Sequence, residues 1–281
     1  MRISNNQPDN SRFINWLDDL CYNPVYYGRI QAPAEARIIF TLSDLCDHTY
    51  PADLLTRACN DHEAFADRAI LSARNGAVAD INAYIIQNMP GEGRTYLATH
   101  EIQESDQESA PPFPPEFLAS LDFPSIPPSR LRLKVGCPVI LLRNLFPERG
   151  LCNGTRLVIV SLGRAIVQAR ILTGDFKGQT THIPKIKLFS SIADFPYIIG
   201  RFQFPFRLCF AITINKSQGQ SLNHIAVDLR APVFTHGQFY VAMSRVTNVH
   251  NLSILLSSAE DLTCTNIVFP EVLLREDESR L

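Results

Sequence analysis

The feature that most constrains the fold is an apolar run that ends abruptly on a polar turn. Residues 206–214 read FRLCFAITI, and the next eight residues, NKSQGQSL, carry a lysine, two glutamines and a glycine. A nearly continuous apolar strand is typical of a parallel sheet that is covered on its two faces. Turns at the carboxyl ends of such strands are where α/β sheets bind ligands, although an ordinary polar loop explains the turn alone equally well.

The pattern around this run predicts an α/β sheet that is interrupted by a β-rich region. Short strands with glycine turns from residue 131 to 189 indicate a small barrel. Residues 100–129 are first acidic and then proline-rich, which favours a mobile connection across the surface. The other elements expected are helices at 11–20, at 43–60 with a break near Pro51, at 75–89 and at 236–247, and strands at 68–73, 94–99, 224–229 and 251–256.

The net charge of −2 hides an uneven distribution. Residues 130–216 contain fourteen Lys/Arg and three Asp/Glu, whereas the remainder contains twelve Lys/Arg and twenty-five Asp/Glu. The basic segment predicts a positive face for a polyanion, with pairing to the acidic remainder as the alternative. Seven cysteines without a CxxC pair fit a reducing compartment, and no metal site is readable.

Two segments carry the candidate chemistry. In the turn, Gly219 permits close approach of the backbone, while Lys216, Gln218 and Gln220 offer hydrogen-bond donors. In the expected helix 236–247, an apolar stripe predicts a buried anchor, which consists of Phe239, Ala242, Met243 and Val246. Arg245 and Gln238 lie on an adjacent face, where an arginine on an anchored helix could bind a phosphate; a surface ion pair is the plainer alternative.

FAITINKSQGQSL and FTHGQFYVAMSRVTNVHNLSIL resemble motifs V and VI of superfamily-one DNA helicases of the Pif/RecD branch, especially the Helitron-type members. RAILSARNGAVADINAYIIQNMPGEGRTYLA is similar to the region of motif IV. IPPSRLRLKVGCPVILLRNLFPERGLCNGTRLVIV and ILTGDFKGQTTHIPKIKLF look like the strands that enter and form the inserted 2B domain of that family. The resemblance covers roughly residues 65–260, in several blocks in the family's order.

The resemblance implies a RecA-like α/β fold of the P-loop NTPase type, with an inserted SH3-like β-barrel. The domains it implies are the end of a first RecA-like domain with connecting helices at 1–64, a second RecA-like domain at 65–150 and 196–270, the 2B domain at 151–195 and a tail at 271–281. It further implies ATP and Mg²⁺ as cofactors, single-stranded DNA as a partner and 5′-to-3′ movement. Arg245 is then the arginine finger, with Gln218, Gly219 and Gln238 on the nucleotide side and Thr213, Asn215 and Lys216 on the DNA backbone.

The chain contains no Gly-Lys dipeptide, and therefore no Walker A motif. We expect it to be the C-terminal half of a helicase, whose Mg-ATP is bound mainly by a missing N-terminal RecA-like domain. The alternative is a non-catalytic nucleic-acid-binding module, a fragment or relic that grips DNA without ATP. The resemblance implies work in genome maintenance or rolling-circle transposition, inside the cell, in the nucleus or alternatively the mitochondrion.

Overall fold

The computed structural model describes residues 8–103, 113–191, 193 and 195–272. Contacts divide the chain into two compact units, and each is described by itself. Unit 1 comprises Met1–Pro51, Asp67–Ile81 and Ala211–Leu281, and unit 2 comprises Ala52–Ala66 and Asn82–Phe210. None of the helices in the described residues combines the length and the apolarity that a bilayer crossing requires.

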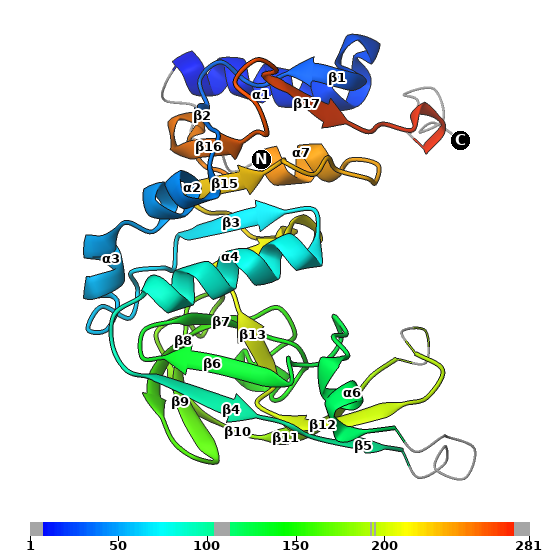
Figure 1. Ribbon diagram of the computed structural model, residues 1–281. Helices are drawn as coiled ribbons and strands as arrows, with labels where there is room; N and C mark the ends of the chain where they lie inside the picture. Colours follow the sequence, from blue (N-terminus) through cyan, green and yellow to red (C-terminus); the bar gives the residue numbers. More distant parts are fainter. Residues whose placement is uncertain (1–7, 104–112, 192, 194, 273–281) are drawn as a thin grey trace. The chain divides into compact units, whose positions relative to one another are not determined.

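Unit 1 is built on a five-stranded parallel sheet, as the sequence predicts (Figure 1). Every neighbouring pair in this sheet runs parallel. The central strands are almost wholly buried, which explains their continuous apolar sequences. In spatial order the strands are β14 (Ala211–Thr213), β3 (Arg68–Ser72), β15 (His224–Asp228), β16 (Leu252–Leu255) and β2 (Arg37–Ile39).

The N-terminal segment up to Pro51 belongs to this same unit and Ala52–Ala66 to unit 2, whereas the resemblance implies that residues 1–64 are the end of a preceding domain with connecting helices. Helix α1 (Pro8–Tyr22) packs against α7 (Gln238–Met243), where Trp16 meets Phe239 edge-on at 6.0 Å between ring centroids. The segment also contributes β2 to the parallel sheet, and β1 (Gly28–Gln31) pairs with β17 (Thr263–Asn266). Strand pairing is a tertiary property, so the local pattern could not reveal it.

The helices expected at 11–20, 43–60 and 75–89 lie close to the predicted positions. Thr41 caps α2 (Leu42–Thr49) through a 3.1 Å bond from the Asp44 amide, and Pro51 separates α2 from α3 (Ala52–Arg57) as predicted. The described residues also form the helices α4 (Asn75–Asn88) and α6 (Pro115–Ser120) and the 3₁₀ turns η1 (Pro24–Tyr26), η2 (Pro147–Arg149), η3 (Ile214–Ser217), η4 (Val249–Asn251) and η5 (Pro270–Val272).

The part of unit 2 that the structure describes contains one five-stranded antiparallel sheet and two smaller sheets. The large sheet has the order β10 (Thr180–Pro184), β9 (Ile166–Ile171), β8 (Arg156–Leu162), β7 (Pro138–Leu141) and β13 (Phe206–Leu208). Its pairing among the described residues is that of an open sheet, so the SH3-like barrel stays a prediction. The smaller sheets are β11 (Ile186–Phe189), β12 (Ile199–Gln203) and β5 (Thr99–Ile102), and β4 (Gly93–Leu97) with β6 (Arg130–Lys134).

Strand β4 corrects one expectation about the α/β sheet. The strand–helix–strand pattern of the sequence predicts that the strand after α4 belongs to the α/β sheet. In the structure this strand, β4, pairs antiparallel with β6 in unit 2. The unit boundaries accordingly differ from the expected domain ranges, since Asn82–Phe210 forms one unit and the expected 2B range begins only at residue 151. The chain changes units within α4, where helical periodicity gives no sign of a boundary.

The proline-rich stretch is also a correction, because most of it is packed rather than mobile. Residues 104–112 of the expected connection lie outside the described residues. From residue 113 onward the segment forms α6 and a small apolar cluster with the sheet of β11 and β12, which contains Leu118, Phe123, Ile126, Leu188 and Ile199. Partly buried aromatic rings extend this cluster, so the segment is part of the unit's core.

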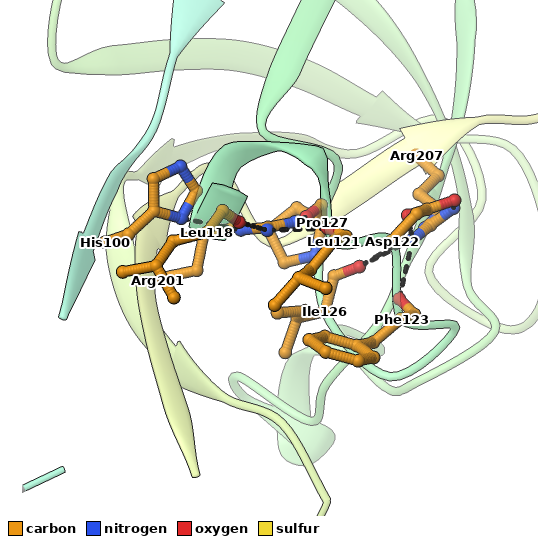
Figure 2. Close-up of polar contacts among 9 residues, drawn as sticks. All are labelled: His100, Leu118, Leu121, Asp122, Phe123, Ile126, Pro127, Arg201 and Arg207. Atoms are coloured by element: carbon orange, nitrogen blue, oxygen red, sulfur yellow. Dashed lines mark hydrogen bonds and ion pairs between the residues drawn. The ribbon is translucent and has the colours of Figure 1, made fainter. Parts of the chain in front are cut away.

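Two arginines hold this segment through its backbone (Figure 2). The fully buried Arg201 donates to the carbonyls of Leu118, Leu121 and Pro127 at 3.1, 2.8 and 2.9 Å. Arg207 donates to the carbonyls of Phe123 and Ile126 and pairs with the carboxylate of Asp122. We call residues 118–127 with these two guanidinium groups the carbonyl cage.

The basic segment is therefore only partly a positive face. Arg156 and Arg201 are fully buried and Lys134 is 4% exposed. Arg156 donates to the carbonyls of Phe65 and Ala66, and Lys134 donates to the carbonyl of Met89. These cations hold backbone oxygen atoms inside unit 2 and are not available to a polyanion. Arg130, Arg132, Arg143, Arg149 and Arg164 are exposed.

Candidate functional site

The candidate turn leaves the carboxyl end of β14 as the single 3₁₀ turn η3 and then reverses direction. Ser217 is fully buried and its hydroxyl donates to the Ile214 carbonyl at 2.6 Å, which closes η3. The Gln220 amide donates to the Ser217 carbonyl at 3.0 Å. Between them Gly219 has φ +80°, a left-handed conformation that favours glycine. Hydrogen bonds within the turn thus fix its backbone conformation.

The side chains expected on the DNA lie along the first half of this turn. Thr213 is half-buried at the end of β14, Asn215 is exposed and Lys216 is half-buried. Gln218 and Gly219, expected on the nucleotide side, are exposed two residues further on. The structure therefore brings these five residues together on one turn at one edge of the parallel sheet.

The helix that precedes Arg245 is shorter than the sequence predicts. Its apolar stripe is buried as expected, since Phe239, Ala242 and Met243 are 0% exposed. However, α7 ends at Met243, because the backbone beyond it pairs with the turn instead of continuing the helix. The Leu222 amide donates to the Arg245 carbonyl at 3.0 Å, and the Thr247 amide donates to the Leu222 carbonyl at 3.1 Å.

The guanidinium of Arg245 lies against the candidate turn. Its Nη1 donates to the Gln220 carbonyl at 3.3 Å, its Nε to the Val241 carbonyl at 3.0 Å and its Nη2 to the Ser244 hydroxyl at 2.8 Å. Arg245 is half-buried, and this burial lowers the pKa of its guanidinium below its usual value, although the nearby Tyr240 opposes the shift. These hydrogen bonds all go to neutral oxygen atoms, which leaves the positive charge uncompensated by them.

Gln238, which the resemblance places on the nucleotide side, is buried in the structure. It is 3% exposed, and its Oε1 accepts a 3.1 Å bond from the Phe234 amide. Its Nε2 donates to Oδ1 of Asn215 at 3.4 Å. The side chain thus ties α7 to the turn, and a direct contact with a nucleotide stays a prediction.

Two further residues belong to the site: Ser244, which the sequence analysis did not single out, and Gln220, which it named only as a hydrogen-bond donor. Ser244 accepts from Arg245 and donates to the Val241 carbonyl at 3.2 Å. Gln220 receives the guanidinium on its carbonyl, while its Nε2 donates to the Lys216 carbonyl at 3.1 Å. Arg74, which lies in the stretch similar to the motif IV region, is exposed just beyond β3, a neighbour of β14 in the sheet.

The three phenylalanines at 202, 204 and 206 differ in exposure. Phe204 and Phe206 are fully buried and stack on each other at 5.5 Å between ring centroids, so both belong to the core. Phe202 is 43% exposed on β12. It is the member of this set that remains accessible to a ligand.

Comparison with known proteins assigns the fold and the family. A family model described as DNA helicase Pif1, 2B domain, matches residues 116–162. The ATP-dependent DNA helicase PIF1 of Homo sapiens is 33% identical over 181 residues, which cover 63% of this chain and 25% of that protein. The same-named protein of Mus musculus is 32% identical over 206 residues, covering 71% and 29%.

Solved structures agree with this assignment. A Pif1 helicase from Candida albicans matches with a TM-score of 0.58 at 23% identity, over 87% of this chain and 53% of that one. A Bacteroides Pif1 bound to ssDNA matches with a TM-score of 0.56 at 20% identity, over 99% and 53%. The chain spans between a quarter and about half of the length of these relatives. The parallel sheet is thus that of a RecA-like motor fold, and the chain belongs to the Pif1-type helicases as their C-terminal region.

Proposed function

We propose that the chain is the C-terminal motor half of an ATP-dependent DNA helicase. In this proposal it couples ATP hydrolysis to 5′-to-3′ movement on single-stranded DNA and to unwinding of the duplex. The names of its relatives support the activity, since PIF1 of Homo sapiens is called an ATP-dependent DNA helicase. Such work would place the protein with DNA, in the nucleus or the mitochondrion.

The observation that carries the proposal is the environment of Arg245. A guanidinium that is half-buried and bonded to neutral oxygen atoms is an electrostatic site for an anion, since burial strengthens its attraction to a phosphate. Arg245 can exchange its bonds to Gln220 and Ser244 for two phosphoryl oxygen atoms. In the transition state it would then stabilise the charge on the transferring γ-phosphoryl group.

The rest of the nucleotide site has to come from another domain. The sequence has no Walker A motif, whose backbone amides and lysine hold the phosphates in P-loop enzymes. An N-terminal RecA-like domain, in the same polypeptide or a separate chain, would supply these groups and hold Mg-ATP. Gln218 and Gly219 would border the γ-phosphate from this chain, with Gln238 behind them.

The DNA would contact the first half of the turn. Thr213, Asn215 and Lys216 offer a hydroxyl, an amide and an ammonium group to backbone phosphates. The exposed arginines of unit 2 add positive charge, whereas the buried Lys134, Arg156 and Arg201 do not. We therefore expect salt-dependent binding with fewer phosphate contacts than the charge count of the sequence suggests.

The test compares two protein preparations. The chain alone should bind labelled oligothymidine with an affinity that falls as salt rises, and Lys216→Met should reduce the salt slope by about 1. It should have no appreciable ATPase activity. In the longer protein that joins the chain to a P-loop domain, Arg245→Ala should lower the ATP turnover rate by about 10³-fold or more while ATP still binds.

Three results would contradict the proposal. Robust turnover by the chain alone, abolished by Arg245→Ala, would mean that it holds its own complete nucleotide site. An affinity for oligothymidine that does not change with salt would remove the phosphate contacts. Unchanged turnover in the Arg245→Ala longer protein would leave the non-catalytic nucleic-acid-binding module as the better account.

A further inference from the structure

The candidate turn and the region of α7 are joined by two polar links. In the first, the Gln238 amide donates directly to the Asn215 side chain at 3.4 Å. In the second, Arg245 donates to the Gln220 carbonyl at 3.3 Å, and the Gln220 side chain donates to the Lys216 carbonyl at 3.1 Å. Each link runs from a residue proposed for the nucleotide side to a residue proposed for the DNA side.

The second link differs from the first because it passes through Gln220, a residue for which we propose no contact with a ligand. Gln220 is half-buried and receives Arg245 on its backbone while it holds Lys216 with its side chain. If the Arg245 guanidinium moved toward a phosphate, the hydrogen bond from its Nη1 to the Gln220 carbonyl would break. The backbone at Gln220 would then be free to move, and Lys216 would lose the fixed position of its partner.

The Gln220 side chain also carries a cost to folding. Its Oε1 is buried and accepts no hydrogen bond from the residues that the structure describes. A buried acceptor without a donor destabilises the folded state, so an apolar side chain of similar length would suit this position better for stability. The amide is therefore explained by its bond to Lys216 rather than by packing.

We propose that Gln220 is a positioning residue that transmits the position of Arg245 to Lys216. This inference rests on the proposed function for the identity of the two ligands, a nucleotide phosphate and a DNA phosphate. The mechanical link itself depends only on hydrogen bonds within unit 1. Arg245 in its present position holds the turn, and Gln220 passes that restraint to the residue expected on the DNA.

The link can be tested in the chain alone with a double-mutant cycle. Gln220→Met removes the donor and the orphaned acceptor while it keeps the length of the side chain, and Arg245→Met keeps the apolar stem of the arginine. Gln31→Met, at an exposed glutamine of β1, is the matched control for the substitution. The first readout is amide hydrogen exchange in residues 213–220, and the second is affinity for oligothymidine.

We expect Arg245→Met to speed exchange across the turn and to weaken oligothymidine binding by about threefold to tenfold, the range for loss of one coupled hydrogen bond. Gln220→Met keeps the backbone carbonyl that accepts from Arg245 and removes only the bond to Lys216, so in this background Arg245→Met should still loosen residue 220. It should add little to the affinity or to exchange at residues 213–217, which is the exchange readout that decides the relay. Gln31→Met should change neither readout. This non-additivity is the signature of a relay, since two independent contacts would give effects that multiply.

The outcomes separate the inference from the proposed function. If Arg245→Met accelerates exchange equally with and without Gln220→Met, or not at all, the relay is wrong whatever the chain binds. If oligothymidine does not bind the unmodified chain, the proposed function fails on the DNA side, while the exchange data still decide the relay. If binding occurs but the two substitutions act independently on affinity, the relay does not reach Lys216.

Discussion

Replacing Arg201 by methionine should release the segment that the carbonyl cage holds. Arg201 is 0% exposed and donates to the carbonyls of Leu118, Leu121 and Pro127. Methionine keeps the apolar stem but leaves these three oxygen atoms without their donor. At about 2 kcal/mol for each buried acceptor, the folded state loses about 6 kcal/mol.

Part of this loss is offset because the variant no longer buries a charge. Burial lowers the pKa of Arg201 from its usual value to about 10, with Asp122 opposing the shift and Arg207 acting in the same direction as burial. At about 1.4 kcal/mol per pKa unit, the charge costs the folded state about 3 kcal/mol. The net destabilisation by Arg201→Met is therefore about 3 kcal/mol, and it falls on unit 2.

Urea denaturation followed by circular dichroism measures the change. With a typical slope of about 2–3 kcal/mol per molar urea, the midpoint should fall by about 1 M, and amides of residues 115–127 should exchange faster in native buffer. Arg164→Met is the control, since Arg164 is exposed on the same unit. Equal midpoints and equal exchange for the two variants would refute the reasoning, because the cage would then contribute nothing to the fold.

The same cage should be sensitive to acid. Nδ1 of His100 accepts a 3.2 Å hydrogen bond from Arg201 Nε, and its Nε2 is hydrogen-bonded to the Ser129 hydroxyl at 3.0 Å. Burial is the main reason, and the charge of Arg201 the second reason, that the pKa of His100 lies below 6.5. The stability that neutral His100 provides is thus complete above pH 6.5 and decreases as the pH falls toward its lower folded-state pKa. Proteolysis of residues 113–127 should therefore rise over that pH range in the wild type, and it should rise less in His100→Asn, which keeps an acceptor without titrating. Equal rises in the two proteins would contradict this prediction. Separately, Gly136→Ala should destabilise unit 2 by about 2 kcal/mol or more, since φ is +84° and an added Cβ would lie 2.3 Å from the Ala58 carbonyl oxygen. Gly154→Ala, with φ +89° and an open surrounding, should cost only the backbone strain, and similar melting temperatures for the two variants would contradict the close contact.

Local pattern determined the elements and the candidate turn. The apolar runs predicted the buried strands of the parallel sheet, and the stripe Phe239, Ala242 and Met243 predicted the buried face of α7. Pro51 predicted the break between α2 and α3. These features depend on residues that are close in sequence, and periodicity and backbone restrictions act at that range.

Tertiary structure decided which strands pair and where each charge lies. The residues that accept hydrogen bonds from Arg201 lie between 74 and 101 positions before it, so a linear pattern could only count it as one more surface cation. The same limit explains β4, which has a strand pattern but finds its partner in β6 rather than in the parallel sheet.

The candidate site shows the same division. The sequence alone identified the turn and Arg245, because each lies within a short motif of characteristic residue types. The contact between Arg245 and the Gln220 carbonyl, and the burial of Gln238, depend on how the backbone after α7 pairs with Leu222. The sequence gives the type of each side chain. Its hydrogen-bond partner is determined only when distant segments pack together, because every buried polar group then needs a hydrogen bond.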